Sequence, residues 1–125
     1  MSPLCLIVDD SRVIRRMAAD ILKGLGLRTA EAEHGLKAVE FCRGTIPDMV
    51  LLDWNMPEMD GISCLKALRA MNLDPRPVVV MCTTENTLSK IREALEAGAD
   101  EYIMKPYDQE VLLDKLAQVG LAERA

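Results

Sequence analysis

The sequence is poor in residues that bind transition metals. It has one histidine, His34, and its four cysteines are so far apart that no two lie at the spacing of a zinc site. We therefore expect a surface or capping role for His34, and we interpret the cysteines as small buried hydrophobes of a cytosolic protein. A reactive thiol at Cys82, near a predicted strand end, remains an alternative. The cysteines are Cys5, Cys42, Cys64 and Cys82.

The sequence also lacks an excess of basic residues and any long hydrophobic run. Its formal net charge is -5 and its pI is about 4.9, whereas nucleic-acid binders need a basic surface to displace counterions. No apolar segment approaches the length of a membrane helix, and the amino terminus lacks a basic-then-apolar export signal. We expect a cytoplasmic protein with no nucleic-acid binding and no membrane insertion. We also expect one domain over 1–125 and no output domain.

What the sequence does contain is a regular alternation of apolar and amphipathic segments. Val50, Leu51 and Leu52 form an apolar run before Asp53 that is too short for a helix. Apolar residues at successive positions indicate a strand buried on both faces, as in a parallel sheet. Five strands alternating with five helices predict a doubly wound α/β fold with helices on both faces. Strands are predicted over 4–8, 27–32, 49–53, 78–82 and 101–104, and helices over 11–25, 36–42, 62–71, 88–97 and 108–119.

The spacing of apolar residues also predicts the inward faces of the helices. Asp60 is a candidate N-cap of the third helix, because a short acidic side chain can accept the free amides of a first turn. Apolar residues three and four positions apart share one helix face. The predicted inward residues are Ile14, Met17, Ala18, Ile21, Leu22 and Leu25 on the first helix, and Leu88, Ile91, Ala94 and Leu95 on the fourth.

Polar residues follow four of the predicted strands. Asp9 and Asp10 follow the first strand, Asp53 ends the third, Thr83 follows the fourth and Lys105 follows the fifth. Ligands of open α/β sheets collect at these carboxyl ends. If the strand order is 2-1-3-4-5, neighbouring strands about 4.8 Å apart would bring the three carboxylates together. Lys105 would lie two strands from Asp53, a gap that an extended lysine can cross.

This set of residues suggests phosphoryl chemistry on Asp53. Three clustered carboxylates repel one another unless a cation neutralises them, and ligands that are all oxygen select a hard cation, of which Mg²⁺ fits best. A carboxylate can attack phosphorus to form an aspartyl phosphate. Mg²⁺, Lys105 and a hydroxyl such as that of Thr83 would then neutralise the transition state. Each residue alone has a simpler reading as a helix cap, a turn residue or a solvated lysine, and only the conjunction points to a site.

The motifs that carry this set resemble the receiver domains of two-component response regulators. They are Leu6-Ile7-Val8-Asp9-Asp10-Ser11, the run from Asp53 to Gly61, Thr83 and Lys105-Pro106. The match spans the chain in the same order. The run after Asp53, with the aromatic Tyr102, is most similar to single-domain chemotaxis response regulators. The resemblance implies a flavodoxin-like fold with the strand order 2-1-3-4-5, an order that the apolar runs by themselves do not specify.

The resemblance also implies residue roles. Asp53 would accept phosphate from a histidine kinase or phosphotransfer protein. Asp10, Asp53 and the backbone carbonyl of Asn55 would ligate Mg²⁺, with Asp9 acting through a water molecule. Lys105 would contact the phosphoryl group, and its peptide bond to Pro106 is expected to be cis.

Further residues are expected to transmit the signal to the surface and to set how long the phosphate persists. Thr83 would move toward the phosphate and Tyr102 would turn inward as a rotamer switch; the simpler reading of Tyr102 is an aromatic packed at the sheet edge. Asn55 and Glu85, each two residues beyond a site residue, would tune the lifetime of the phosphate.

The implied function is a phosphorylation-activated switch and not an enzyme, acting on a separate partner that could be the flagellar motor switch in chemotaxis. The alternative within the family is a phosphorelay shuttle, a phosphate sink or a kinase regulator. Ser11-Arg12 after the acidic pair, together with Lys90 and Arg92, depart from the most similar regulators and put motor binding in doubt.

Two other classes of function fit the sequence less well. An aspartyl-phosphate phosphatase commonly has its two aspartates two residues apart on the first strand, whereas Asp9 and Asp10 are adjacent here. A flavodoxin-type cofactor carrier would need a phosphate-binding loop of glycines or hydroxyls after the first strand, which this sequence lacks.

Overall fold

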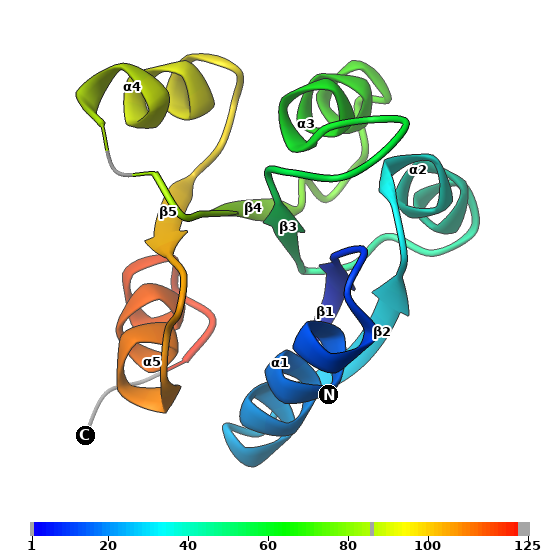
Figure 1. The fold of residues 1–125 in the computed structure, drawn as a ribbon. Helices are drawn as coiled ribbons and strands as arrows, with labels where there is room; N and C mark the ends of the chain where they lie inside the picture. The colour runs from blue at the N-terminus through cyan, green and yellow to red at the C-terminus, as the bar shows by residue number, and fades with distance from the viewer. Residues whose placement is uncertain (1, 86, 123–125) are drawn as a thin grey trace.

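The computed structural model describes residues 2–85 and 87–122 of the chain. Five parallel strands form one sheet in the order β2-β1-β3-β4-β5, and a helix follows each strand along the chain (Figure 1). The predicted fold class and strand order are therefore confirmed. The strands are β1 Leu4–Val8, β2 Arg28–Ala32, β3 Met49–Asp53, β4 Val78–Thr83 and β5 Glu101–Met104; the helices are α1 Arg12–Gly24, α2 Gly35–Gly44, α3 Gly61–Ala70, α4 Leu88–Glu96 and α5 Gln109–Gln118.

The central strand β3 is buried along its whole length, including Asp53 at its carboxyl end. It lies between β1 and β4, with Leu51 paired to Ile7 on one side and to Val80 on the other. A strand with neighbours on both edges and helices on both faces is almost completely shielded from water, which explains its continuous apolar run.

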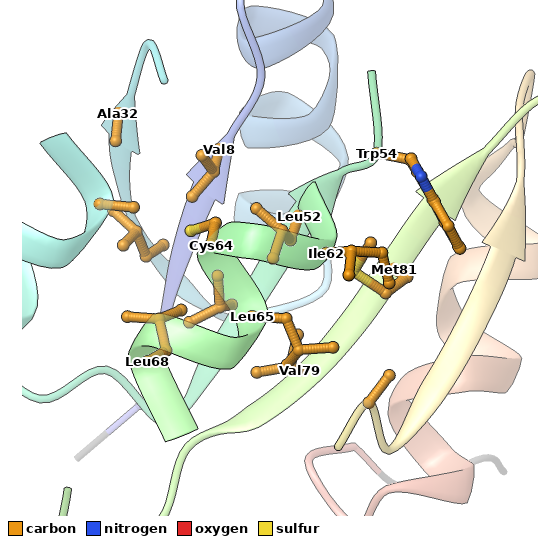
Figure 2. Packing of buried hydrophobic residues seen from close by; sticks show 14 of the residues in the cluster. Val8, Ala32, Leu52, Trp54, Ile62, Cys64, Leu65, Leu68, Val79 and Met81 are labelled. Carbon is orange, nitrogen blue, oxygen red and sulfur yellow. The ribbon is translucent and has the colours of Figure 1, made fainter. Parts of the chain in front are cut away.

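Side chains alternate between two cores, one on each face of the sheet. Leu52 and Leu65 belong to the core covered by α2, α3 and α4, part of which is shown in Figure 2. Leu51 and Leu112 belong to the core covered by α1 and α5. Figure 1 shows these two helix layers on opposite sides of the sheet. The connections leaving the carboxyl ends of the strands therefore meet at one edge of the sheet, where the site lies.

All five helices begin with a side chain that accepts a backbone amide of the first turn. The cap of α3 is Asp60, as predicted, with its Oδ1 2.8 Å from the amide nitrogen of Ser63. His34 caps α2 through Nδ1, which confirms its capping role. These bonds satisfy amides that have no partner within the helix, so each helix start is fixed at a defined residue. The other caps are Ser11, Thr87 and Asp108.

Three predicted core positions are wrong. Met17 of α1 is 50% exposed, and Leu88 and Leu95 of α4 are 69% and 47% exposed. Leu88 and Leu95 are about two turns apart and share one flank of α4, whereas Ala94 is the buried residue of that helix. Helical spacing identifies an apolar face, but it does not say how much of that face the sheet covers.

Among the described residues, none of the helices combines the length and apolar character needed to cross a membrane.

Candidate functional site

The residues predicted from the strand ends lie together at the carboxyl edge of the sheet. Asp9 follows β1, Asp53 ends β3 and pairs with Cys82 of β4, and Lys105 follows β5. The backbone pairing continues past the strands, because the amide of Asp9 donates to Ala32 and the amide of Lys105 donates to Thr83. The main chain at this edge is thus fixed by the sheet itself.

Three carboxylates form the acidic part of the site. One oxygen from each of Asp9, Asp10 and Asp53 lies within 4.8 Å of the other two. Asp9 and Asp53 are buried, Asp53 to 6% exposure, whereas Asp10 is exposed to solvent. Such a set offers only hard oxygen ligands with one side open to water, which suits Mg²⁺ because that ion keeps several water ligands.

Lys105 joins two of these carboxylates. Its ammonium nitrogen lies 2.8 Å from Oδ1 of Asp53 and 2.9 Å from Oδ2 of Asp9. Burial alone would lower the pKa of Lys105, but the hydrogen bonds and charges of Asp53 and Asp9 raise it above its usual value. The lysine therefore stays charged in the resting site and compensates part of the carboxylate repulsion.

The pKa of the Asp53 carboxyl is raised above its usual value. Its burial is the main cause, and the nearby charge of Asp9 acts in the same direction. Lys105 and a backbone hydrogen bond from Asn55 oppose this shift. The folded protein thus holds Asp53 in an environment that disfavours its negative charge until a further cation is present.

The loop after β1 is held by contacts that the sequence interpretation missed. Ser11 donates its amide to Oδ1 of Asp9 at 2.9 Å. Arg15 donates to the carbonyl of Asp9 at 2.8 Å and pairs with Glu31 of β2 at 3.0 Å. The guanidinium thereby fixes the backbone between the acidic pair and α1. Arg15 lies off the inner helix face, and its role depends on β2 lying beside β1, which spacing alone does not reveal.

The loop after β3 closes tightly on the site through Gly61. The amide of Gly61 donates to the carbonyl of Trp54 at 2.8 Å. A Cβ at this position would lie 2.5 Å from the carbonyl oxygen of Asp53 and 2.7 Å from Cα of Trp54. These are backbone atoms that cannot move aside, so only glycine allows α3 to begin this close to Asp53.

Thr83 and Glu85 form a separate contact at the end of β4. The buried hydroxyl of Thr83 accepts the amide of Glu85 at 2.9 Å and donates to its carbonyl at 3.2 Å. Thr83 is thus engaged with its own loop in this structure. Asn55 and Glu85 are both exposed, on the loops after β3 and β4. The roles predicted for these three residues remain predictions.

Tyr102 lies on β5, paired with Met81 of β4, and is half-buried against the core under α2, α3 and α4. The ammonium of Lys115 lies 4.9 Å from the centre of its ring. The expected inward rotation is a further prediction. The Lys105–Pro106 peptide bond is cis, as expected, and a second cis bond at Asp74–Pro75 was not foreseen.

A reactive thiol at Cys82 is disfavoured by the structure. The side chain is buried, and desolvation by burial raises the pKa of its thiol well above the usual value. A thiol that stays protonated is neither a nucleophile nor a metal ligand.

The sheet has the flavodoxin-like order, and it presents an acidic cluster and a partly buried lysine at its carboxyl edge, where ligands of doubly wound α/β domains bind. The chain belongs to the response regulator receiver domain family, whose model matches residues 5–117. Receiver domains of this type are phosphoacceptor switches that interact with histidine kinases and downstream proteins, and they bind Mg²⁺ at an aspartate cluster. Asp9, Asp10 and Asp53 form such a cluster here.

Curated relatives and solved structures agree with this assignment. The chain is 41% identical over 116 residues to chemotaxis protein CheY1 of Helicobacter pylori, covering 91% of this chain and 94% of that protein. It is 38% identical over 117 residues to chemotaxis protein CheY of Bacillus subtilis, covering 93% and 96%. The structure of chemotaxis protein CheY4 of Vibrio cholerae matches with a TM-score of 0.90 at 32% identity, covering 95% and 99%. The chain is therefore CheY-like in both sequence and fold.

Proposed function

We propose that this protein is a phosphorylation-activated switch whose phosphoacceptor is Asp53. The observation that carries the proposal is the bridge from Lys105 to Asp53 and Asp9, with Asp10 completing the acidic cluster. A phosphohistidine of a histidine kinase or phosphotransfer protein is the proposed donor. A carboxylate oxygen of Asp53 forms the new bond to phosphorus, the bond from phosphorus to the histidine nitrogen breaks, and that nitrogen keeps the electron pair.

The residues around Asp53 have distinct parts in this proposal. Asp10, Asp53 and the backbone carbonyl of Asn55 would hold Mg²⁺, with Asp9 acting through a water molecule. Bound there, the ion would supply positive charge to the phosphoryl oxygens. Lys105 already lies within hydrogen-bond distance of Asp53 and would donate to one of those oxygens as the transferring group arrives.

The signal is proposed to leave the site through Thr83. Its hydroxyl now bonds the backbone of Glu85. The phosphoryl group adds nearly two negative charges and strong acceptors, so Thr83 would exchange the Glu85 contact for the phosphate. Tyr102 would then turn inward beside β4. A partner that prefers this form must in return favour phosphorylation, because coupling between two sites is reciprocal.

The output is proposed to be a separate protein, reached in the cytoplasm, where the four cysteines would remain reduced. The names of the relatives favour a role in chemotaxis, and the proposed target within it is the flagellar motor switch. Leu88 and Leu95 of α4 support a protein partner, because two large apolar side chains are exposed on one flank of this helix.

The second candidate is a phosphorelay shuttle, a phosphate sink or a kinase regulator. It is favoured by the charges of α4, where Lys90 and exposed Arg92 lie among acidic residues. Binding of phosphorylated protein to a motor switch peptide discriminates the two. A gain in affinity on phosphorylation supports chemotaxis, and no gain supports the second candidate.

The central proposal is tested with acetyl phosphate and Mg²⁺, followed by intact mass. We expect the mass of one phosphoryl group to be added to the native protein and to Asp20→Asn, a matched control at an exposed aspartate of α1. Asp53→Asn is expected to add none, and chelation of Mg²⁺ to stop uptake by the native protein. Uptake by Asp53→Asn would contradict the assignment of the phosphoacceptor.

The lifetime of the phosphate is proposed to depend on Asn55 and Glu85, which are exposed two residues beyond Asp53 and Thr83. After removal of acetyl phosphate, the loss of phosphoryl mass measures autodephosphorylation. Substitution at either position should change this rate more than the extent of loading. An unchanged rate in both variants would refute this role.

A further inference from the structure

The tryptophan next to the proposed phosphoacceptor is in contact with a lysine of α4. The ammonium of Lys90 lies 4.8 Å from the centre of the Trp54 ring. This distance is typical of a cation–π interaction, in which the ring face attracts a positive charge. Trp54 directly follows Asp53, so one contact links the start of α4 to the residue beside the site.

Backbone hydrogen bonds and burial both restrict the position of Trp54. Its amide donates to the carbonyl of Cys82 at 3.0 Å, and its carbonyl accepts the amide of Gly61 at 2.8 Å. The side chain is only 7% exposed and packs in the same core as Ile62 and Met81 (Figure 2). Of the two partners, the lysine is the one free to move, because it is half-exposed at the end of a flexible stem.

The charge of Lys90 also reaches the loop that follows Asp53. The pKa of Asp60 is lowered chiefly by hydrogen bonds from Ser63, with smaller contributions from the positive charges of Lys66 and Lys90. Lys90 therefore lies within electrostatic range of Asp60, at the end of the loop that follows Asp53. The backbone of Lys90 is in turn bonded to the cap of α4, since its amide donates to the Thr87 hydroxyl.

We propose that Lys90 is a positioning residue that couples the charge state of residue 53 to the first turn of α4. In the resting protein its ammonium rests on Trp54 and holds α4 against the site. A phosphoryl group on Asp53 attracts the ammonium more strongly than an aromatic ring does, because attraction between full charges exceeds attraction to a ring quadrupole. Lys90 leaves the ring and α4 shifts with it.

This inference rests on the proposed function but is separate from the predicted movements of Thr83 and Tyr102. Those residues act through β4 and β5. Lys90 acts through the loop after β3, and the contact depends on a cation at this position of α4. It also gives the positive charge of Lys90 a role within the protein, in addition to any role in binding a partner.

The test uses the fluorescence of Trp54, the one tryptophan of the chain. Native protein, Lys90→Met and Lys90→Arg are treated with Mg²⁺ and acetyl phosphate, and intact mass records the loaded fraction of each. Lys66→Met is the matched control, because it removes a second lysine whose charge also reaches Asp60. Hydrogen exchange of α4 amides is measured on the same samples.

Phosphorylation is expected to change Trp54 emission and the exchange of the first α4 turn in native protein, Lys90→Arg and Lys66→Met. Lys90→Met is expected to lose most of both changes while still taking up the phosphoryl group. A purely structural lysine would alter only the resting emission. A full response in Lys90→Met would overturn the inference, as would a failure of that variant to load, since Lys90 would then act in transfer itself. Failure of the native protein to load would refute the proposed function instead.

Discussion

Lys105 and Asp53 are 52 residues apart in the chain, and their side chains meet at 2.8 Å. The lysine reaches from the end of β5 past β4 to the end of β3, and it bonds Asp9 as well. The resting site is thus neutralised in part by a cation of the chain itself. Two carboxylates share one ammonium, which leaves the cluster with a net negative charge and room for a divalent ion.

Removing this cation should slow phosphorylation. In Lys105→Met the initial rate with acetyl phosphate is expected to fall by about 10²-fold, the usual effect of losing one donor to a developing oxyanion. Lys66→Met, at an exposed lysine of α3, is expected to retain the native rate. The time course of intact mass measures both. A Lys105→Met protein loading at the native rate would show that the lysine does not contact the phosphoryl group.

Removing the acceptor charge should stabilise the fold. The raised pKa of Asp53 means that its ionised form is disfavoured in the folded protein, first by burial and also by Asp9. A carboxylate that is ionised at neutral pH although the fold disfavours its charge lowers stability, so Asp53→Asn is expected to raise the free energy of unfolding by about 1 kcal/mol without Mg²⁺. Urea denaturation at neutral pH measures it, with Asp20→Asn as the control. A less stable Asp53→Asn protein would show that the Lys105 bond outweighs the cost of the buried charge.

The approach of α3 to the site can be tested with two glycines. Gly61→Ala is expected to destabilise the protein by about 1–3 kcal/mol, the usual cost of overpacking, because its Cβ would collide with the backbone of Asp53 and Trp54. Gly44→Ala in the last turn of α2 has no heavy atom within 4 Å of its Cβ and should stabilise by about 0.5–1 kcal/mol. Equal stability of the two variants would mean that α3 can withdraw from the site without cost.

Acid sensitivity should depend on Asp100 at the opposite end of the sheet. Its carboxylate accepts hydrogen bonds from Arg69, Arg76 and the amide of Val79. Burial alone would raise its pKa, but these bonds, with Arg76 the strongest, lower the pKa below the usual 3.8. The stabilisation is therefore complete above that pH and is lost as the pH falls through the lowered pKa.

Asp100→Asn is accordingly expected to lose about 0.5–1 kcal/mol near neutral pH, because its hydrogen bonds are charged but lie at the solvent-exposed surface, where water screens them. The difference from the native protein should shrink as the pH falls below 3.8. Urea midpoints across this pH range test it. Phosphorylation at neutral pH serves as the control and should be unchanged. A difference that is constant with pH would rule out the carboxylate charge as its source.

The sheet and the convergence of the site could be predicted because they depend on local features. A short run of successive apolar residues ended by a polar one marks both a buried strand and its carboxyl end, as at Val8-Asp9 and Leu52-Asp53. Parallel strands then bring these ends to one edge regardless of the details of packing. The strand order itself came from the family resemblance, since apolar runs do not specify their neighbours.

Contacts between elements could not be predicted in the same way. Arg15 lies over β2 and Lys90 lies over Trp54 only once the helices are docked. Leu88 and Leu95 have the spacing of a core face, yet the flank that carries them is left uncovered. In each case the sequence specifies which residue types share a helix face, whereas the neighbouring element decides what that face contacts.

The burial of all four cysteines has a practical consequence. Burial raises the pKa of Cys42 to about 11 and those of Cys5 and Cys64 to about 12, and that of Cys82 higher still. Such thiols do not compete for maleimide reagents under mild conditions. A new cysteine on the surface of α4 could therefore carry a dye without removal of the native cysteines. Energy transfer from Trp54 to that dye would then report the distance between α4 and the site before and after phosphorylation.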